Sequence, residues 1–391
     1  MDFIAQTLGI SPVEIRRRNF LKHGQTTTTE QVINEQIDLG KLLDRALELS
    51  DYRAKKETFA QKKLSANTKK GIGIAAFLHG AGFTGSGERY LNSLVGVETC
   101  PDGTVQVLVS STEFGQGTKT VLCQIAAEAL GVRYEDVGIA QPDTQKVPNS
   151  GPTVASRTIM VVGKLVHSAA LAILQTLRSS GLLGEVYSPE EFRAACRKHV
   201  EQHGIFRSLA RYQQADDISW DEENYRGAAY AAFAWAVYIA EVTVDLTSYS
   251  VTVDDFVCLQ EVGRVLHPVL AAGQIIGGVA QGIGFALYEK VIWENGRMKN
   301  GQMTNYIMPT SADIPPIRVF FEELGNVPGA FGAKGIGELP MDGPAPAIVN
   351  AITDALGITF NSIPVLPEDI FEAVTSNGSR DPMPASADSK R

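Results

Sequence analysis

The chain has 391 residues, enough for two domains that each bury a core of ordinary size. Hydrophobic residues make up 44% and charged residues 20%, the balance of a folded globular protein rather than of a disordered or fibrous one. The 35 basic and 44 acidic side chains give a formal net charge of -9, which argues against nucleic acid as a partner. The longest apolar run, residues 228–240, is shorter than the roughly 20 residues of a membrane helix, so we expect no membrane partner.

The first seventy residues are predicted to be helical and connecting. Residues 1–8 have a helical pattern that stops at Gly9, and Ser11 opens a second short helix. Two further helical patterns cover residues 39–49 and 52–63. Because no basic-then-apolar signal segment opens the chain, we expect a cytoplasmic location. The start inside a helix looks like a cut edge, which predicts that another segment belongs before it.

A β-rich region begins at Gly71 and includes a hairpin around the turn Pro101-Asp102-Gly103. A charged stretch, residues 188–223, is predicted to separate two domains. The remaining elements, from apolar periodicity, are helices at 119–130 and 161–179, strands at 237–246 and 250–259, a glycine-rich helix at 274–288, a strand at 317–322 and a helix at 344–356.

One carboxylate stands in the glycine-rich segment 332–340, whose sequence is Gly-Ala-Lys-Gly-Ile-Gly-Glu-Leu-Pro. The structural interpretation is a turn before a helix, with Glu338 favourably placed against the helix dipole. The functional interpretation is a general base, from which apolar neighbours exclude water. Taken alone, the segment leaves both interpretations open.

Three other segments could each contact a ligand. Residues 111–118, Ser-Thr-Glu-Phe-Gly-Gln-Gly-Thr, follow a strand and open a helix, a geometry that offers backbone N–H groups to a phosphate-bearing ligand. Residues 148–158 concentrate hydroxyl groups and small side chains, as in a cofactor loop or a capped turn. Residues 273–284 are predicted to be helical and contain several glycines, so part of the helix surface has no side chains. Either close packing of another helix or a bound ligand explains this feature.

Together, these four segments resemble the molybdopterin-binding subunits of the xanthine dehydrogenase and aldehyde oxidase family. The resemblance extends from the helix pair that ends at Asn19 to residues 305–315, Asn-Tyr-Ile-Met-Pro-Thr-Ser-Ala-Asp-Ile-Pro. It implies an α+β fold with mixed sheets and packed helices, in which two subdomains bind the cofactor. The expected division is N-terminal helices and connector over 1–70, a first cofactor-binding subdomain over 71–187, a charged linker over 188–225, a second subdomain over 226–375 and a disordered tail over 376–391.

The resemblance also implies the roles of individual residues. Glu338 would be the catalytic base beside the metal, where it would deprotonate a molybdenum-bound hydroxyl. The pterin would hold molybdenum near Ala155 and Glu338, with no side chain as a direct ligand. Phe83 and Thr84 fall where the family places an aromatic ring against a planar substrate, although a structural aromatic is the alternative. The implied cofactor-binding residues are Gly115, Gln116, Gly117, Thr153, Ala155, Ser156, Thr158 and Gln274.

Two features depart from the family pattern. The family usually has Asp and Asn in the stretch that here reads Glu261 to Pro268, and we expect neither substitution to touch a cofactor contact. His267 in this stretch is interpreted as structural, because a lone histidine before proline is a weak metal-ligand signal. The family's upstream half, with an Arg-Gly-Phe-Gly loop over the metal, does not occur in this sequence, which favours a natural split subunit over a fragment of a longer product.

The expected protein is therefore a half-subunit of a molybdenum hydroxylase that oxidises an electron-poor carbon of a purine-like N-heterocycle, or an aldehyde, with oxygen from water. Its cofactor would be molybdopterin with molybdenum, in the cytosine dinucleotide form. The resemblance also implies that electrons would pass to [2Fe-2S] and FAD partners, and the lack of a cysteine cluster or a dinucleotide motif in the sequence fits that division of labour. The alternatives are a non-catalytic cofactor-binding or scaffold half, and a subunit of the carbon-monoxide-oxidising branch.

Overall fold

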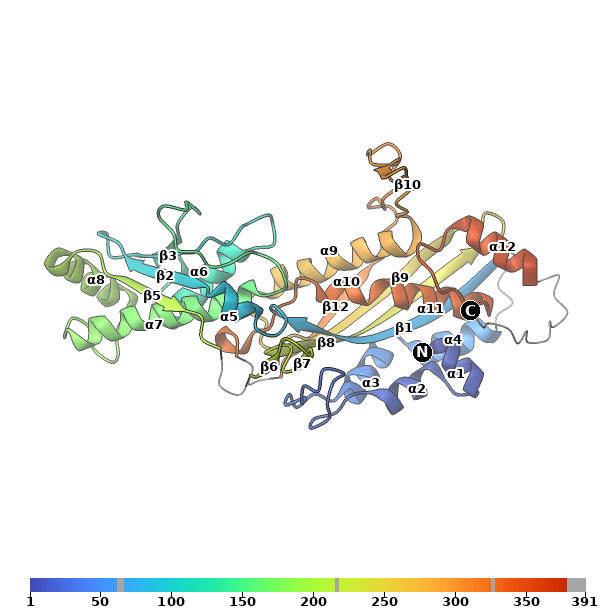
Figure 1. The fold of residues 1–391 in the computed structure, drawn as a ribbon, viewed down its shortest axis with the longest axis horizontal. Helices are drawn as coiled ribbons and strands as arrows, with labels where there is room; N and C mark the ends of the chain where they lie inside the picture. The colour runs from blue at the N-terminus through green and yellow to red at the C-terminus, as the bar shows by residue number, and fades with distance from the viewer. Residues whose placement is uncertain (62–66, 215–217, 325–327, 378–391) are drawn as a thin grey trace.

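Two lobes lie at opposite ends of an elongated molecule in the computed structural model, which describes residues 1–61, 67–214, 218–324 and 328–377 (Figure 1). Each lobe has its own four-stranded mixed sheet. In spatial order, the first sheet contains β4 (Val137–Ile139), β3 (Val105–Leu108), β2 (Leu94–Thr99) and β5 (Arg207–Arg211), and the second contains β1 (Thr68–Ala81), β8 (Ala232–Asp245), β9 (Val251–Glu261) and β12 (Ile317–Glu322). The predicted α+β fold with mixed sheets and packed helices is confirmed.

The first lobe buries one face of its sheet under three helices. The predicted hairpin is present, because β2 and β3 pair antiparallel on either side of the Pro101-Asp102-Gly103 turn. Alternate residues of β2, Val95 and Val97, join the same buried cluster as Val105 and Val107 of β3, as the period of two in a strand requires. The covering helices are α6 (Thr118–Leu130), α7 (Gly163–Ser179), which continues from a π-helical turn over Thr158–Val162, and α8 (Pro189–His203).

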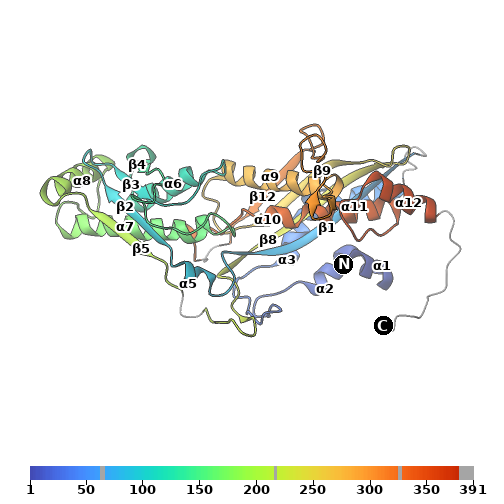
Figure 2. The ribbon, with the colours of Figure 1, turned by 45° about the horizontal axis from the view of Figure 1, so that its top comes forward.

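The second lobe buries both faces of its sheet. Even-numbered residues of β8, such as Ala236 and Tyr238, pack with α9 (Pro268–Leu287) and α11 (Pro344–Leu356). Odd-numbered residues, such as Trp235 and Val237, pack instead with α3 (Leu39–Leu49). Figure 2 shows α3 on the side of the sheet opposite α11. A strand that is buried on both faces is apolar throughout, which is why residues 228–240 formed the longest apolar run.

Glycines on β1 allow α11 to lie close to the sheet. A Cβ atom on Gly73 would come within 2.2 Å of the Ala347 carbonyl oxygen and 2.3 Å of the Ala351 nitrogen. We expect Gly73→Ala to lower the free energy of unfolding by about 1–3 kcal/mol or more, because backbone has to move. Urea unfolding measures this change. The control is Gly277→Ala on α9, where a Cβ has no neighbour within 4 Å and helix propensity predicts a gain of about 0.5–1 kcal/mol. Equal stabilities for the two variants would contradict the close approach.

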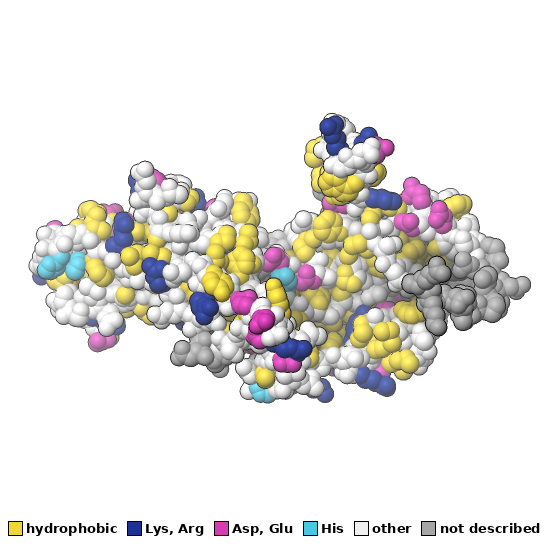
Figure 3. Space-filling model, in the orientation of Figure 1, with side chains coloured by type: hydrophobic (Ala, Val, Ile, Leu, Met, Phe, Trp, Pro, Cys, Tyr) yellow, Lys and Arg dark blue, Asp and Glu magenta, His cyan; other side chains and the backbone are white. Residues whose placement is uncertain are grey.

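The smaller elements include an arm that projects from the second lobe. Residues 290–308 form this arm around the ribbon of β10 (Trp293–Glu294) and β11 (Arg297–Met298), and hydrophobic side chains gather on it (Figures 1 and 3). Trp293 and Met303 are 67% and 80% exposed. The other elements are α1 (Asp2–Leu8), α2 (Pro12–Asn19), α4 (Tyr52–Gln61), α5 (Gly87–Leu91), β6 (Trp220–Asp221), β7 (Arg226–Gly227), α10 (Leu339–Asp342) and α12 (Pro367–Asn377).

The lobes do not follow the predicted domain boundaries. Strand β1 was expected in the first subdomain, but it pairs along its whole length with β8 and so belongs to the second lobe. Helix α8 and strand β5 were expected in a linker over 188–225, but β5 pairs with β2 and α8 packs in the first core. The charged side chains of α8 and β5 lie mainly on the solvent side of these two elements. Of the predicted tail over 376–391, residues 376 and 377 end helix α12, and the rest lies outside the described residues.

Two helical stretches are long and apolar enough to cross a membrane by length and composition alone, Thr158–Ser179 and Pro268–Leu287. The prediction from residues 228–240 did not consider them, and residues 232–240 of that run belong to β8. Core helices share this length and composition, and α7 buries Leu165, Val166 and Ile173 in the first lobe. Length and composition therefore do not place either stretch in a membrane.

Candidate functional site

A cavity of about 360 Å³ lies where the two lobes meet, within the range of about 300–1,000 Å³ that ligand pockets span. The first lobe contributes residues 116–118 and 153–159 to its wall, and the second contributes residues 264–267, 274 and 333–338. All four segments that the sequence singled out therefore meet at one place. The predicted site residues on the wall are Gln116, Gly117, Thr153, Ala155, Ser156, Thr158, Gln274 and Glu338.

Glu338 is held at the cavity wall by Ser156 of the other lobe. The Ser156 hydroxyl donates to Glu338 Oε2 at 2.9 Å and accepts from the Glu338 backbone N–H, also at 2.9 Å. This double contact fixes the carboxylate against the loop that was predicted to bind the cofactor. The expected burial by apolar neighbours is wrong for this chain, because the Glu338 side chain is 52% exposed. Of the apolar residues near it, Leu339 is buried in the second core, and Ile336 packs partly against that core while it also lines the cavity.

The loop that carries Ser156 has an unusual backbone. Ala155 and Ser156 both have positive φ, 53° and 50°, a region that costs side-chain-bearing residues about 1–3 kcal/mol. Gly335 explains part of this shape, since a Cβ there would lie 1.6 Å from the Ser156 carbonyl oxygen. The glycine at position 335 therefore allows the Glu338 segment and the Ser156 loop to touch.

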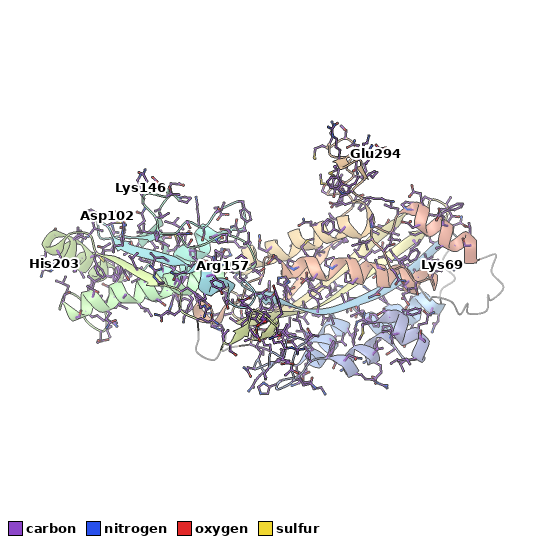
Figure 4. The ribbon with its side chains drawn as sticks, in the orientation of Figure 1. Lys69, Asp102, Lys146, Arg157, His203 and Glu294 are labelled. Carbon is purple, nitrogen blue, oxygen red and sulfur yellow. The ribbon has the colours of Figure 1, made fainter. Side chains whose placement is uncertain are left out.

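The buried guanidinium group of Arg157 forms hydrogen bonds that hold the same loop in place. Arg157 is fully buried and forms two hydrogen bonds of 2.8 Å to Glu88, one to each carboxylate oxygen, and a third of 2.7 Å to the Ser93 hydroxyl. It also donates to the carbonyl oxygens of Ser150 and Pro152. Figure 4 shows Arg157 at the end of the first lobe nearest the second. Sequence reasoning missed this anchor, although an arginine among small residues before an apolar helix was a visible signal.

The loop over residues 111–118 differs from its predicted role. Its backbone N–H groups were expected to face a phosphate-bearing ligand, but the Glu113 carboxylate accepts from Gly115, Gly117 and Lys119 at 2.8, 3.1 and 3.0 Å. Burial acts to raise the pKa of Glu113, but these bonds together hold the pKa below its usual value. A fixed negative charge thus occupies the helix N-terminus. The physical reason is that Glu113 lies within reach of the donors in its own loop.

Gln116 and Gln274, the two glutamines predicted to bind the cofactor, differ in the hydrogen bonds of their side-chain amides. Gln116 uses its amide within its own loop, donating to the Thr112 carbonyl at 2.7 Å and the Thr118 hydroxyl at 2.9 Å. Gln274 on α9 is half-buried at the cavity, and its side chain has no hydrogen bond to any residue that the structure describes. Such an amide suits a polar ligand. Gly115 lies beside the cavity wall, with φ 112° and open space on its Cβ side.

Phe83 and Thr84 do not lie on the cavity wall. Phe83 is half-buried, and the Thr84 hydroxyl donates to the Tyr230 hydroxyl at 2.8 Å. The neighbouring Gly82 N–H donates to the Ala155 carbonyl at 2.9 Å, so this pair lies next to the Ser156 loop. The structure brings Phe83 near the site without showing a substrate contact.

A buried lysine holds the start of the Glu338 segment. Lys334 is 4% exposed, and its Nζ donates to Glu261 at 2.5 Å, to the Phe233 carbonyl at 2.7 Å and to Glu35 at 3.3 Å. Burial raises the pKa of Glu261, although Lys334 opposes this effect. Glu261, one of the departures from the family pattern, therefore supports the segment that carries Glu338. His267, nearby, accepts from the Leu270 N–H at 3.2 Å and caps α9, as its structural interpretation predicts.

A histidine that sequence reasoning missed lies directly beside Glu338. His79 Nε2 is 3.4 Å from Glu338 Oε2, and its Nδ1 is 2.7 Å from Asp342 Oδ2. Two features of the sequence could have revealed the cluster of His79, Glu338 and Asp342. Glu338 and Asp342 are four residues apart at the start of a helix. His79 lies on the same face of β1 as Gly73, and α11 packs against that face.

The family of molybdopterin cofactor-binding domains matches residues 45–315, more than half of the chain, and the chain belongs to that family. Among its relatives, the aldehyde oxidoreductase of Megalodesulfovibrio gigas is 31% identical over 96% of this chain and 40% of the relative. The xanthine dehydrogenase molybdenum-binding subunit of Escherichia coli O157:H7 is 28% identical over 95% of this chain and 50% of the relative. The predicted membership of the xanthine dehydrogenase and aldehyde oxidase family is confirmed.

Solved structures agree with this assignment. The aldehyde oxidoreductase from Desulfovibrio desulfuricans ATCC 27774 has a TM-score of 0.83 at 29% identity, over 95% of this chain and 39% of that one. Quinoline 2-oxidoreductase from Pseudomonas putida 86 has a TM-score of 0.82 at 26% identity, over 96% and 50%. The chain thus spans about 40–50% of the length of these relatives.

Proposed function

We propose that the chain is the Glu338-bearing half of a molybdenum hydroxylase, which oxidises an electron-poor carbon with oxygen from water. The observation that carries this proposal is the position of Glu338, on the wall of a cavity formed by all four predicted segments and held there by Ser156. A carboxylate held at a cavity suits a general base. The family assignment supplies the chemical context, since its domains bind molybdopterin cofactor.

The chain's own residues would hold the cofactor and handle a proton. When bound, the molybdenum cofactor supplies the two-electron oxidation of the substrate carbon. The unpartnered amide of Gln274 would hold the pterin, and the wall formed by Thr153, Ala155 and Thr158 would lie against it. The Glu338 carboxylate would take up the proton released in the reaction. We further propose that the pterin is in its cytosine dinucleotide form. Acid hydrolysis would release the nucleotide, and its identification would test this proposal.

The proposed substrate is a purine-like N-heterocycle or an aldehyde. Relatives are named for xanthine, nicotine and quinoline as well as for aldehydes. Phe83, which follows the residue whose backbone N–H bonds to the Ala155 carbonyl, is the proposed contact for a planar ring, with Thr84 beside it. Carbon monoxide is a weaker candidate, since the chain is 19% identical to CO dehydrogenase from Oligotropha carboxidovorans and shares its fold alone.

The proposed partners are the upstream half of the molybdenum subunit and subunits with [2Fe-2S] and FAD, in a cytoplasmic complex. Several relatives are named as subunits of a complex or as large subunits, which supports partner chains. The exposed hydrophobic side chains of the arm, such as Trp293 and Met303, offer surface for such a partner.

Metal content tests the split site. We expect the chain purified alone to contain far less than one molybdenum per chain, and the chain produced together with the product of its adjoining reading frame to contain about one. Elemental analysis measures this, and a dye-reduction assay with xanthine, nicotine, quinoline and benzaldehyde then identifies the substrate class. Stoichiometric molybdenum in the lone chain would contradict the split site. A loaded complex that oxidises none of these would favour the non-catalytic alternative.

A further inference from the structure

His79 and Asp342 form a hydrogen-bonded pair that ends at Glu338. The distances are 2.7 Å from Asp342 Oδ2 to His79 Nδ1 and 3.4 Å from His79 Nε2 to Glu338 Oε2. The three side chains come from β1, from the end of α10 and from the residue before α10. His79 is 24% exposed at its side chain, so it contacts both the carboxylate and solvent.

We propose that His79, oriented by Asp342, is the positioning residue through which Glu338 returns its proton to solvent after each turnover. This inference rests on the proposed function, in which Glu338 is the base. The proposed cofactor and upstream half would both cover the exposed side of Glu338. His79, which contacts the same Oε2 atom that accepts from Ser156 but does not lie on the cavity wall, would then be the remaining route from the carboxylate to water.

The proton steps balance without any further reagent. Asp342 accepts the hydrogen bond of Nδ1–H, so Nε2 of neutral His79 carries the free lone pair that faces Glu338. Protonated Glu338 transfers its proton to Nε2, which restores the carboxylate and produces an imidazolium. Asp342 stabilises that cation, and Nε2 then releases the proton to water or to a buffer base.

Electrostatics support this order of events. The hydrogen bond to Asp342, as the largest cause, together with the charges of Asp342 and Glu338, raises the pKa of His79, although partial burial opposes it. Glu338 and Asp342 are the charged groups that face His79 from α10 and the residue before it, and burial raises the pKa of Tyr238 of β8, which feels the charge of Asp342. A raised pKa favours acceptance of a proton from a carboxylic acid. Since only neutral His79 can accept, turnover should fall as the pH drops through the raised pKa.

A titration without catalysis tests the pairing. In the full chain with ¹⁵N-labelled histidine, His79 is assigned as the resonance that disappears in His79→Gln. We expect its midpoint to lie above the ordinary value for histidine, and to fall in Asp342→Asn and, by less, in Glu338→Gln. The resonance of His199, a residue of α8 in the other lobe, is the internal control and should be the same in all variants. A His79 midpoint that is unchanged in Asp342→Asn would overturn the proposal.

Kinetics of the holoenzyme separate proton return from structure. In His79→Gln we expect the first turnover to stay within about twofold of wild type, because Glu338 starts as a carboxylate. The steady-state kcat of His79→Gln should fall by about tenfold or more. In His79→Ala, added imidazole should restore kcat in proportion to the concentration of neutral imidazole. In Asp342→Asn the acid limb of the kcat profile should move to lower pH. His203→Gln, at the far end of the first lobe, is the control (Figure 4).

The outcomes distinguish this proposal from the proposed function. A His79→Gln enzyme with native steady-state kcat, or one slowed equally in its first turnover and unaffected by imidazole, overturns proton return through His79. His79→Asn serves as a second variant if His79→Gln does not fold. Near-native turnover in Glu338→Gln would instead overturn the base assignment itself, whatever the His79 variants show.

Discussion

Replacing Glu338 by glutamine is expected to lower kcat by about 10²–10⁴-fold in the loaded complex, because general base catalysis contributes about that much. Glutamine keeps the shape of the side chain and can still bond to Ser156 Oγ, which contacts Glu338 at 2.9 Å. It cannot take up a proton. We therefore expect the fold and the molybdenum content to stay normal while the chemical step fails. Single-turnover reduction by substrate, followed by absorbance, measures that step directly.

The matched control for this change is Glu201→Gln. Glu201 is an exposed residue of α8, far from the cavity, and its replacement should leave both turnover and molybdenum content unchanged. A Glu338→Gln enzyme with near-native rates would rule out the base assignment. A variant without molybdenum would show instead that Glu338 helps to hold the cofactor.

Replacing Lys334 by methionine is expected to lower the free energy of unfolding by about 3–5 kcal/mol, the cost of removing one partner from a buried ion pair. Lys334 and Glu261 are 4% and 1% exposed, so the change leaves the Glu261 carboxylate buried without its cation. Urea unfolding, followed by the fluorescence of buried Trp235, measures the loss. Lys41→Met at an 87% exposed side chain is the control, with little expected effect.

The effect of Lys334→Met should depend on pH. Burial already raises the pKa of Glu261, and Lys334 opposes that rise, so the variant should raise it further. An acid whose pKa is higher in the folded state binds its proton more tightly there, so stability falls as pH rises from its unfolded pKa through its folded pKa. The destabilisation should therefore be smaller at low pH than at neutral pH. In the double variant with Glu261→Gln, part of the lost stability should return. A loss independent of pH would contradict the unpaired-carboxylate explanation.

Local patterns predicted most of the elements and the segments of the site. Capping residues and apolar periodicity gave α3 at its observed bounds and the β2–β3 turn, because these depend on neighbours in sequence. The four glycine-rich or hydroxyl-rich segments were found because each has a distinctive composition. Their shared role at a cofactor was implied by the resemblance alone, and the structure brings all four segments to one cavity.

Long-range pairing accounts for what sequence reasoning missed. Strand β1 lies before the whole first lobe in sequence yet pairs with β8 from Thr68 to Ala81, and no local signal specifies that partner. His79 comes to Glu338 only because of this pairing, since the two residue numbers, 79 and 338, differ by 259. The Glu113 carboxylate was overlooked for the opposite reason. Its hydrogen bonds are local, but the segment was interpreted as a set of backbone N–H donors for a phosphate, without the Glu113 carboxylate as their acceptor.

The two lobes have separate hydrophobic cores, and each supplies part of the cavity wall. A ligand in that cavity binds only when both lobes are folded, so its binding energy adds to the coupling that the apolar cluster of Ala81, Met160, Val161 and Ala232 already provides between them. The loaded chain should therefore melt more cooperatively and at a higher temperature than the empty chain. In this sense the cofactor would be a structural member of the protein, because it would join the two lobes more firmly.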